Sequence, residues 1–316
     1  MGKIKNLVFE GGGVKGIAYG GALSALDEAG VLKNVRRVAG TSAGAITAVL
    51  LAVGYSSADL SKVVAGTDFN SFADDSAGVL RDVSRLIHRY GVYKGSFFTE
   101  WIRDLIEEKT CVPQMTFAQL RDYSGLELFL TGTNLTKNRV DIFSHETTPD
   151  MEIALAARIS MGIPIYFQAV TLNGDIMVDG GVSYNYPLNL FDHDKYVVEA
   201  AFGKADLGRA EAGYRFNQET LGLRVDSPGE IEAGQTWSGA GNDIQGFGDF
   251  TLALVNFLQF IANKKHLSRR DWNRTVFIDS GDVNATDFGL KQDQIDMLLE
   301  NGRAAVDSYF KVKAVM

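Results

Sequence analysis

The chain has 316 residues, of which 46% are hydrophobic and 22% are charged. This length and composition can bury a large core, and no repeat, linker or low-complexity tract divides the sequence, so we expect a single domain over residues 1–316. The net charge of −8 argues against a nucleic-acid-binding protein, because such proteins present basic surfaces to phosphates.

The first predicted elements are a strand at residues 4–9, a glycine loop at residues 11–16 and a helix at residues 17–26. Gly11, Gly13 and Gly16 fit the G-x-G-x-x-G pattern of dinucleotide-binding loops. However, the second strand, at residues 35–39, is followed by Gly-Thr-Ser and not by the acidic residue that holds the ribose. A phosphate-binding loop of the NTPase type also fails, because Lys and Ser/Thr are absent after Gly16. A plain turn for tight strand–helix packing is the other interpretation.

The second strand leads into Gly40-Thr41-Ser42-Ala43-Gly44, and a helix is predicted directly after it at residues 45–53. Gly40 and Gly44 lack the Cβ atoms that would clash in a strained strand-to-helix turn, which is typical of a nucleophile elbow. The positive end of the helix dipole points at Ser42 and favours negative charge there. The sequence therefore predicts Ser42 as a nucleophile, against a chance match in a chain with 34 glycines.

The later elements alternate in the same way. We predict strands at residues 126–131, 140–143, 176–178 and 195–200, and helices at residues 97–108, 151–158 and 292–309. Alternation of strands and helices is typical of an α/β fold, in which a mostly parallel sheet carries helices on both faces.

The sequence offers two kinds of general base for Ser42. His193 and His266 follow it in the order of an α/β-hydrolase triad, but His193 stands between two aspartates and His266 in a basic run, which indicates surface positions. Asp179 comes at the end of a short apolar strand and is followed by Gly180 and Gly181. Burial of such a carboxylate would raise its pKa toward the range of a general base, although Asp-Gly is also a common turn.

Together these motifs resemble the patatin-like phospholipases. The resemblance rests on Gly-Gly-Gly-Val-Lys-Gly at 11–16, Gly-Thr-Ser-Ala-Gly at 40–44 and Asp-Gly-Gly at 179–181. Ile163-Pro164 with Phe167 and Asn185-Tyr186-Pro187 are similar to further family motifs. The segment at 274–310 resembles the closing strand and helix that pack back on core motifs at 4–200. The family fold is a three-layer sandwich of the α/β class.

The resemblance implies a lipid acyl hydrolase of the phospholipase A type with a Ser42–Asp179 dyad and an acyl-enzyme intermediate. It places the oxyanion hole at Gly11, Gly12 and Gly13, with Lys15, Gly16, Gly40, Gly44, Gly180 and Gly181 as supporting residues. The expected substrate is a phospholipid or a related acyl lipid. One departure concerns residues 157–162, where this chain has Ala-Arg-Ile-Ser-Met-Gly although the family commonly has small residues, Ala-Ser-x-Ser, before Ile-Pro. This departure puts the lining of the acyl pocket in doubt.

Composition and short motifs indicate the cellular compartment and the need for cofactors. One cysteine, Cys111, excludes an internal disulfide and suits a reducing compartment. A strand predicted from residue 4 leaves no room for a signal peptide, and the apolar runs are too short to span a bilayer. We expect a cytoplasmic protein, with transient membrane association or signal-independent secretion as alternatives. Without HExxH, CxxC or paired-histidine spacing, we expect no metal and no cofactor.

Three segments have open interpretations. Leu254, Phe257, Leu258 and Ile261 follow helical spacing and precede a basic run, which fits either a peripheral membrane anchor or, as we favour, a core helix. The basic residues at 81–89 indicate a solvated face. The Gly-rich stretch at 226–250 is a lid, a loop ordered by a protein activator, or a plain surface loop.

Two other functions remain in competition. A nucleotide-binding oxidoreductase would use the 11–16 loop and keep its function without the Ser42 hydroxyl. A non-catalytic member of the fold would bind lipid or a partner, and nothing would label Ser42.

Overall fold

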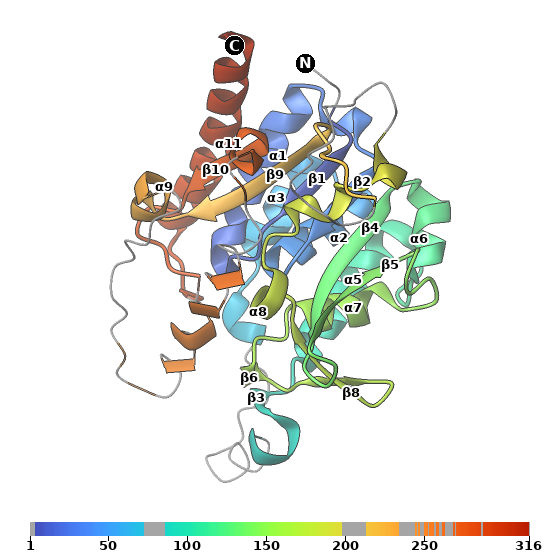
Figure 1. Ribbon diagram of the computed structural model, residues 1–316. Helices are drawn as coiled ribbons and strands as arrows, with labels where there is room; N and C mark the ends of the chain where they lie inside the picture. Colours follow the sequence, from blue (N-terminus) through green and yellow to red (C-terminus); the bar gives the residue numbers. More distant parts are fainter. Residues whose placement is uncertain are drawn as a thin grey trace.

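The computed structural model describes residues 4–72, 86–197 and 213–233, positions 244 and 246, parts of 250–262, and 268–315 apart from 269 and 286. Its centre is an eight-stranded sheet of order β10-β9-β1-β2-β4-β8-β7, in which β5 also pairs with β4 (Figure 1). Its strands are β1 Asn6–Phe9, β2 Arg37–Gly40, β4 Glu127–Asn134, β5 Arg139–Ser144, β7 Val170–Leu172, β8 Asp175–Asp179, β9 Thr220–Asp226 and β10 Thr275–Asp279.

The sheet is parallel on one side and antiparallel on the other. The strands β10, β9, β1, β2 and β4 run parallel to their neighbours. In contrast, β5 and β8 pair with β4 in the antiparallel sense, and β7 pairs with β8 in the same way. A separate two-stranded sheet joins β3 Gly91–Tyr93 and β6 Ile165–Phe167. The expected α/β fold with a mostly parallel sheet is confirmed.

Helices surround this sheet (Figure 1). They are α1 Ala18–Glu28, α2 Ala43–Ala52, α3 Ser57–Gly66, α5 Ser96–Thr110, α6 Phe117–Ser124, α7 Ile153–Ser160, α8 Gly181–Tyr184, α9 Pro228–Ala233 and α11 Gln292–Val315. Short 3-10 helices add η1 Gly13–Ile17, η2 Leu32–Asn34, η3 Phe69–Phe72, η4 Leu188–Phe191, η5 Asp194–Tyr196 and η7 Asp271–Arg274. The long α11 packs along α1 and against the edge strand β10.

Alternating side chains of the central strands fill two cores. Leu7 and Phe9 of β1 point into a large core shared with the helices, whereas Val8 between them points to the opposite face, as the period of two in a strand requires. On that second face, Val8 packs in a smaller cluster with residues of the 186–196 segment, which include Tyr186 and Phe191. Layers therefore cover both faces of the sheet.

One predicted element is wrong in part. The strand expected at 195–200 begins instead as the 3-10 turn η5, and residues 198–200 lie outside the described residues. Lys195 and Tyr196 both bond the Glu146 carboxylate, at 2.6 and 2.8 Å, and the N–H of Asp194 bonds Gly213 O. These contacts hold the chain as a turn although its sequence is apolar enough for a strand.

Candidate active site

The glycine loop and the elbow are brought together by the register of two neighbouring strands. Phe9, the last residue of β1, pairs with Gly40, the last residue of β2. Since the two strands are parallel, both motifs emerge from the same edge of the sheet, where ligands bind in open α/β sheets. This edge is the natural position for a site built from both loops.

The elbow has the backbone strain expected of a nucleophile. Ser42 immediately precedes α2 and has φ 52° and ψ −126°, a conformation that is rare for residues other than glycine. A Cβ on Gly44 would lie 2.6 Å from Glu10 O, and one on Gly40 would collide with Gly44 O. The two outer glycines therefore let the elbow pack tightly on the end of β1.

Asp179 reaches the elbow through β4. Gly40 of β2 lies opposite Leu130 of β4, and Gly132 of β4 lies opposite Asp179 at the end of β8. The main-chain N–H of Asp179 donates to Gly162 O, and its carbonyl accepts from Thr133 Oγ1 at 2.8 Å. Asp179 is therefore fixed at the end of a strand close to Ser42, although the two are far apart in sequence.

The Ser42 and Asp179 side chains are both buried, with exposures of 3% and 0%. Burial raises the pKa of Asp179 to about 7, while the N–H of Gly181, 2.6 Å from Oδ1, and the Ser42 hydroxyl oppose this rise. The second oxygen, Oδ2, has no hydrogen-bond partner among the described residues. The Ser42–Asp179 contact is therefore looser than a formed hydrogen bond, as is common before substrate binds.

Two residues of the 157–162 segment complete the surroundings of Ser42. The Ser42 N–H donates to Ser160 Oγ over 3.1 Å, and Ser42 Oγ lies 4.0 Å from Met161 Sδ. Ser160 was not singled out from the sequence, because a serine at the end of a helix usually bonds its own helix backbone. Met161 also lies beside the nucleophile.

Some N–H groups of the glycine loop already donate hydrogen bonds to main-chain carbonyls. The Gly11 N–H donates to Asn185 O over 3.1 Å, and the Val14 N–H donates to Ala285 O over 3.0 Å. Gly13 has φ 56°, and a Cβ on it would collide with Ala285 O. Of the residues predicted for the oxyanion hole, Gly11, Gly12 and Gly13, Gly11 therefore has an N–H that already donates to an acceptor, and the oxyanion hole itself stays a prediction.

Gly16 and Gly180, two of the residues predicted to support the site, lie where a Cβ atom would meet close neighbours. A Cβ on Gly16 would lie 3.0 Å from Ala43 Cβ, and a Cβ on Gly180 would lie 2.7 Å from Thr131 O. Lys15 is partly buried on η1, and its charge acts on Glu10 and Glu230.

Comparison with known proteins shows the family of this chain. The family model of the patatin-like phospholipases matches residues 7–192, more than half of the chain. The chain belongs to the patatin-like phospholipases. YqhO of Bacillus subtilis is 31% identical over 96% of this chain and 97% of its own length. The probable lipid hydrolase 463L of Invertebrate iridescent virus 6 is 28% identical over 59% of this chain and 62% of its own.

A solved structure shares the fold. VipD from Legionella pneumophila superposes with a TM-score of 0.59 and 20% identity, covering 98% of this chain and 67% of that chain. The patatin fold expected from the sequence is thereby confirmed.

The histidines of this patatin-like chain make other contacts. His193 Nδ1 lies 2.6 Å from Asp194 Oδ1, and the His145 ring packs on Phe129. His88 is exposed, and His266 lies outside the described residues. No hydrogen bond joins Ser42 to a histidine among the residues that the structure describes.

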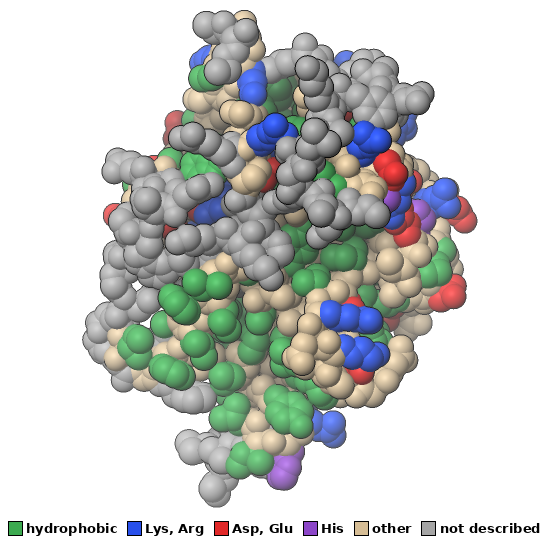
Figure 2. Space-filling view, viewed as in Figure 1, with side chains coloured by type: hydrophobic (Ala, Val, Ile, Leu, Met, Phe, Trp, Pro, Cys, Tyr) green, Lys and Arg blue, Asp and Glu red, His purple; other side chains and the backbone are tan. Residues whose placement is uncertain are grey.

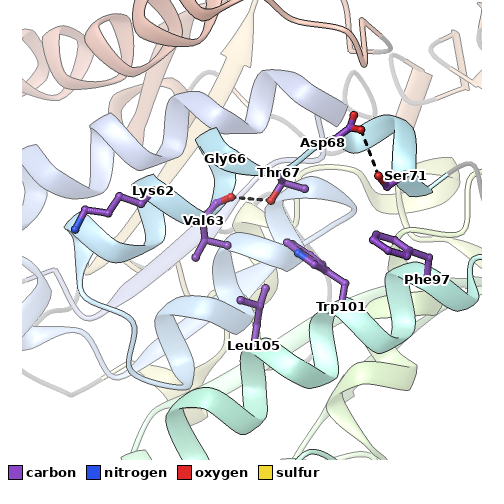
Figure 3. Close-up of a pocket in the computed structure, with 9 residues that line it drawn as sticks. All are labelled: Lys62, Val63, Gly66, Thr67, Asp68, Ser71, Phe97, Trp101 and Leu105. Atoms are coloured by element: carbon purple, nitrogen blue, oxygen red, sulfur yellow. Dashed lines mark hydrogen bonds between the residues drawn. The ribbon is translucent and has the colours of Figure 1, made fainter.

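Two pockets of the patatin-like chain lie outside the motifs. One of about 350 Å³ between α3 and α5 is lined by Val63, Thr67, Trp101 and Leu105 among others (Figure 3). Another, of about 500 Å³, lies between β10 and α11. Neither is lined by Ser42 or Asp179, which is consistent with their burial.

No cluster of three or more His, Cys, Asp or Glu side chains suited to a metal ion occurs in the described part of the chain. Within the same residues, no helix combines the length and the apolar composition needed to cross a membrane.

The apolar stripe favoured as a core helix is exposed. The exposed fractions are 40% for Leu254, 49% for Phe257, 36% for Leu258 and 47% for Ile261. Figure 2 shows hydrophobic side chains gathered on the lower part of the face that carries the orange segment at 250–262. In the sequence, Lys264, Lys265, Arg269 and Arg270 follow; the first three lie outside the described residues, as do Arg81, Arg85 and most of the 234–249 stretch.

Proposed function

We propose that this patatin-like chain is a lipid acyl hydrolase in which Ser42 attacks the ester carbonyl of a phospholipid or a related acyl lipid. Membership of the family supports lipid hydrolysis as the class of activity. The observation that carries the proposal is the strained Ser42 at the start of α2 beside a buried Asp179 whose pKa is raised to about 7. A carboxyl with that pKa exchanges protons near neutral pH, as a general base must.

The reaction begins with attack by Ser42 Oγ on the acyl carbonyl carbon. As the new C–O bond forms, Asp179 Oδ2 takes the hydroxyl proton, and the carbonyl oxygen becomes an oxyanion. The N–H groups of Gly12 and Gly13 donate to this oxyanion, and the N-terminus of α2 adds a favourable dipole. Preorganised donors of this kind lower the barrier because they need no rearrangement during the reaction.

Collapse of the tetrahedral adduct breaks the bond to the alcohol, and Asp179 returns the proton to the leaving oxygen. The acyl group is then an ester of Ser42. Asp179, now ionised, takes a proton from water as the water attacks this ester. A second collapse breaks the bond from the acyl carbon to Ser42 Oγ, which takes the proton back from Asp179, and the fatty acid is released.

We further propose that the exposed stripe of Leu254, Phe257, Leu258 and Ile261 touches the surface of a lipid aggregate. An apolar stripe in water is costly unless a partner covers it, and an amphipathic segment followed by cations is typical of interfacial binding. The basic residues after the stripe would complement anionic head groups although the whole chain is acidic. We also propose that Lys15, at the glycine loop, meets a lipid phosphate as a point charge.

Mass analysis of products from a mixed lipid extract tests the proposed function. We expect free fatty acid and lysophospholipid from the wild-type protein and neither from Ser42→Ala. Asp179→Asn should be equally inactive while it keeps the wild-type circular dichroism spectrum. A non-catalytic lipid-binding protein would instead retain lipid without releasing fatty acid, and an oxidoreductase would be unaffected by Ser42→Ala.

A further inference from the structure

A buried glutamate stands directly before the glycine loop. Glu10 follows the last residue of β1, is 4% exposed, and has a main chain held from two sides. Its N–H donates to Leu223 O of β9 over 3.1 Å, and its carbonyl accepts from the Tyr19 hydroxyl over 2.8 Å. The Glu10 carboxyl is thus fixed at the base of the loop that presents Gly12 and Gly13.

Asn185 clamps the first residue of that loop. Its carbonyl accepts the Gly11 N–H over 3.1 Å, and its amide Nδ2 donates to Gly11 O over 3.0 Å and to Glu10 Oε1 over 3.3 Å. Both main-chain polar groups of Gly11 are therefore held by one residue. A Cβ on Gly11 would collide with the Asn185 amide oxygen and lie 3.0 Å from Ser42 Cβ, so this amide lies close to the nucleophile.

The clamp joins the two halves of the site. Asn185 directly follows α8, the short helix that begins after Asp179 and Gly180, whereas Glu10 and Gly11 follow β1. A shift of either half would break the hydrogen bonds at Gly11. We propose that Glu10 and Asn185 are positioning residues, which hold the glycine loop so that its Gly12 and Gly13 N–H groups meet the oxyanion. This inference rests on the proposed hydrolase function.

The charge of Glu10 follows from its surroundings. Arg224 of β9 binds Asp226 through Nε and Nη2 at 2.7 Å and approaches Glu10 Oε2 at 3.5 Å. The Arg224 charge lowers the pKa of Glu10, whereas burial and the Asp226 charge raise it, and burial is the largest of these effects. Burial raises the pKa of Glu10 to about 8. Among the described residues, the charged and titratable groups that act on it include Arg224, Asp226, Lys15, Glu230, Tyr19 and Tyr186.

A neutral Glu10 is suited to this position. Near pH 7 the carboxyl is protonated and accepts the Asn185 amide without placing a negative charge at the loop. Above pH 8 it ionises, and a buried negative charge then lies beside donors that must stabilise an oxyanion, which opposes the reaction. The rate should therefore fall at alkaline pH through ionisation of Glu10.

The first test compares the pH dependence of kcat/KM for wild type and Glu10→Gln, with fatty acid release from a short-chain phosphatidylcholine as the assay. Glutamine has the size of glutamate and stays neutral. We expect Glu10→Gln to keep its activity at pH 7 within about threefold and to lose the decline centred near pH 8. A purely structural glutamate would not control a limb of the pH profile.

The second test changes the clamp. Asn185→Asp replaces the Nδ2 donor with a carboxylate oxygen facing Gly11 O and Glu10. We expect kcat to fall about 100-fold with little change in KM, comparable to the loss of an oxyanion-hole donor. Asn6→Asp is the matched control, because Asn6 is equally buried at the opposite end of β1 and its Oδ1 accepts from Arg37. This control should keep the wild-type kcat.

The outcomes distinguish failure of the positioning role from failure of the hydrolase function. If Glu10→Gln keeps the wild-type alkaline decline, or Asn185→Asp keeps the wild-type kcat, the positioning role is wrong and the hydrolase proposal stands. If folded wild-type protein hydrolyses no ester, the hydrolase proposal fails and the positioning role fails with it.

Discussion

The Ser42 hydroxyl lies close enough to the buried Asp179 carboxyl to oppose the rise of its pKa, which burial lifts to about 7. A general base must be ionised to accept a proton, so kcat/KM should fall as pH drops below about 7. The pH profile measured with a soluble short-chain phospholipid checks this. A profile that stays flat down to pH 5 would assign proton transfer to another group.

Burial of the Asp179 carboxylate also lowers the free energy of unfolding once the group is ionised. Its pKa in the folded protein is raised above the value of the unfolded chain, so the folded state binds the proton more tightly and stability is lost as pH rises from about 4 to 7. Asp179→Asn removes this loss. We expect its free energy of unfolding, relative to wild type, to increase across that interval by up to the order of 4 kcal/mol.

Urea unfolding of both proteins at pH 4 and pH 8 measures this difference. Glu10 titrates in both proteins, so its contribution cancels in the comparison. An advantage of Asp179→Asn that is the same at the two pH values would mean that the Asp179 carboxyl is not the source.

The outer glycines of the elbow should be intolerant of even one methyl group. In Gly44→Ala the new Cβ would lie 2.6 Å from Glu10 O, and overpacking of this kind costs roughly 1–3 kcal/mol. We expect a lower unfolding midpoint and loss of turnover. Gly66→Ala is the control, because a Cβ there has nothing within 4 Å at the end of α3 and should be neutral or slightly stabilising. Equal midpoints for the two variants would contradict the close packing of the elbow.

Because the exposed apolar stripe is proposed to contact lipid, we expect activity to depend on whether the substrate is aggregated or monomeric. Replacing Leu254, Leu258 and Ile261 with serine should reduce hydrolysis of anionic vesicles about tenfold or more, since each apolar side chain contributes to interfacial binding. Hydrolysis of monomeric short-chain lipid should be unchanged. Val312→Ser on α11, where Val312 is 59% exposed, is the control. Equal losses on both substrates would indicate damage to the fold instead of a lost lipid contact.

Much of the site could be predicted from the sequence because its motifs are local. The elbow around Ser42 is a run of five residues, and Asp179 closes a short strand followed by glycine, so spacing and residue type identified both as candidates. Their proximity depends on β4, which lies between β2 and β8. Only the resemblance to a known fold indicated that relationship in advance.

Other features depend on partners that are distant in sequence. The Gly11 N–H was predicted to serve the oxyanion hole, but Asn185 O accepts it, and nothing near Gly11 in the sequence indicates this. Likewise, the helical spacing of Leu254 and Ile261 identifies an apolar face but not what covers it, and the core position favoured from the sequence is wrong for these side chains.

The central claim is that Ser42 is the nucleophile, and covalent labelling tests it most directly. A fluorophosphonate with an acyl-like chain, followed by peptide mass mapping, should give one adduct on the peptide that contains Ser42. The rate of labelling should fall strongly in Asp179→Asn. A hydrolytically active preparation that is labelled at another residue, or not at all, would contradict the account.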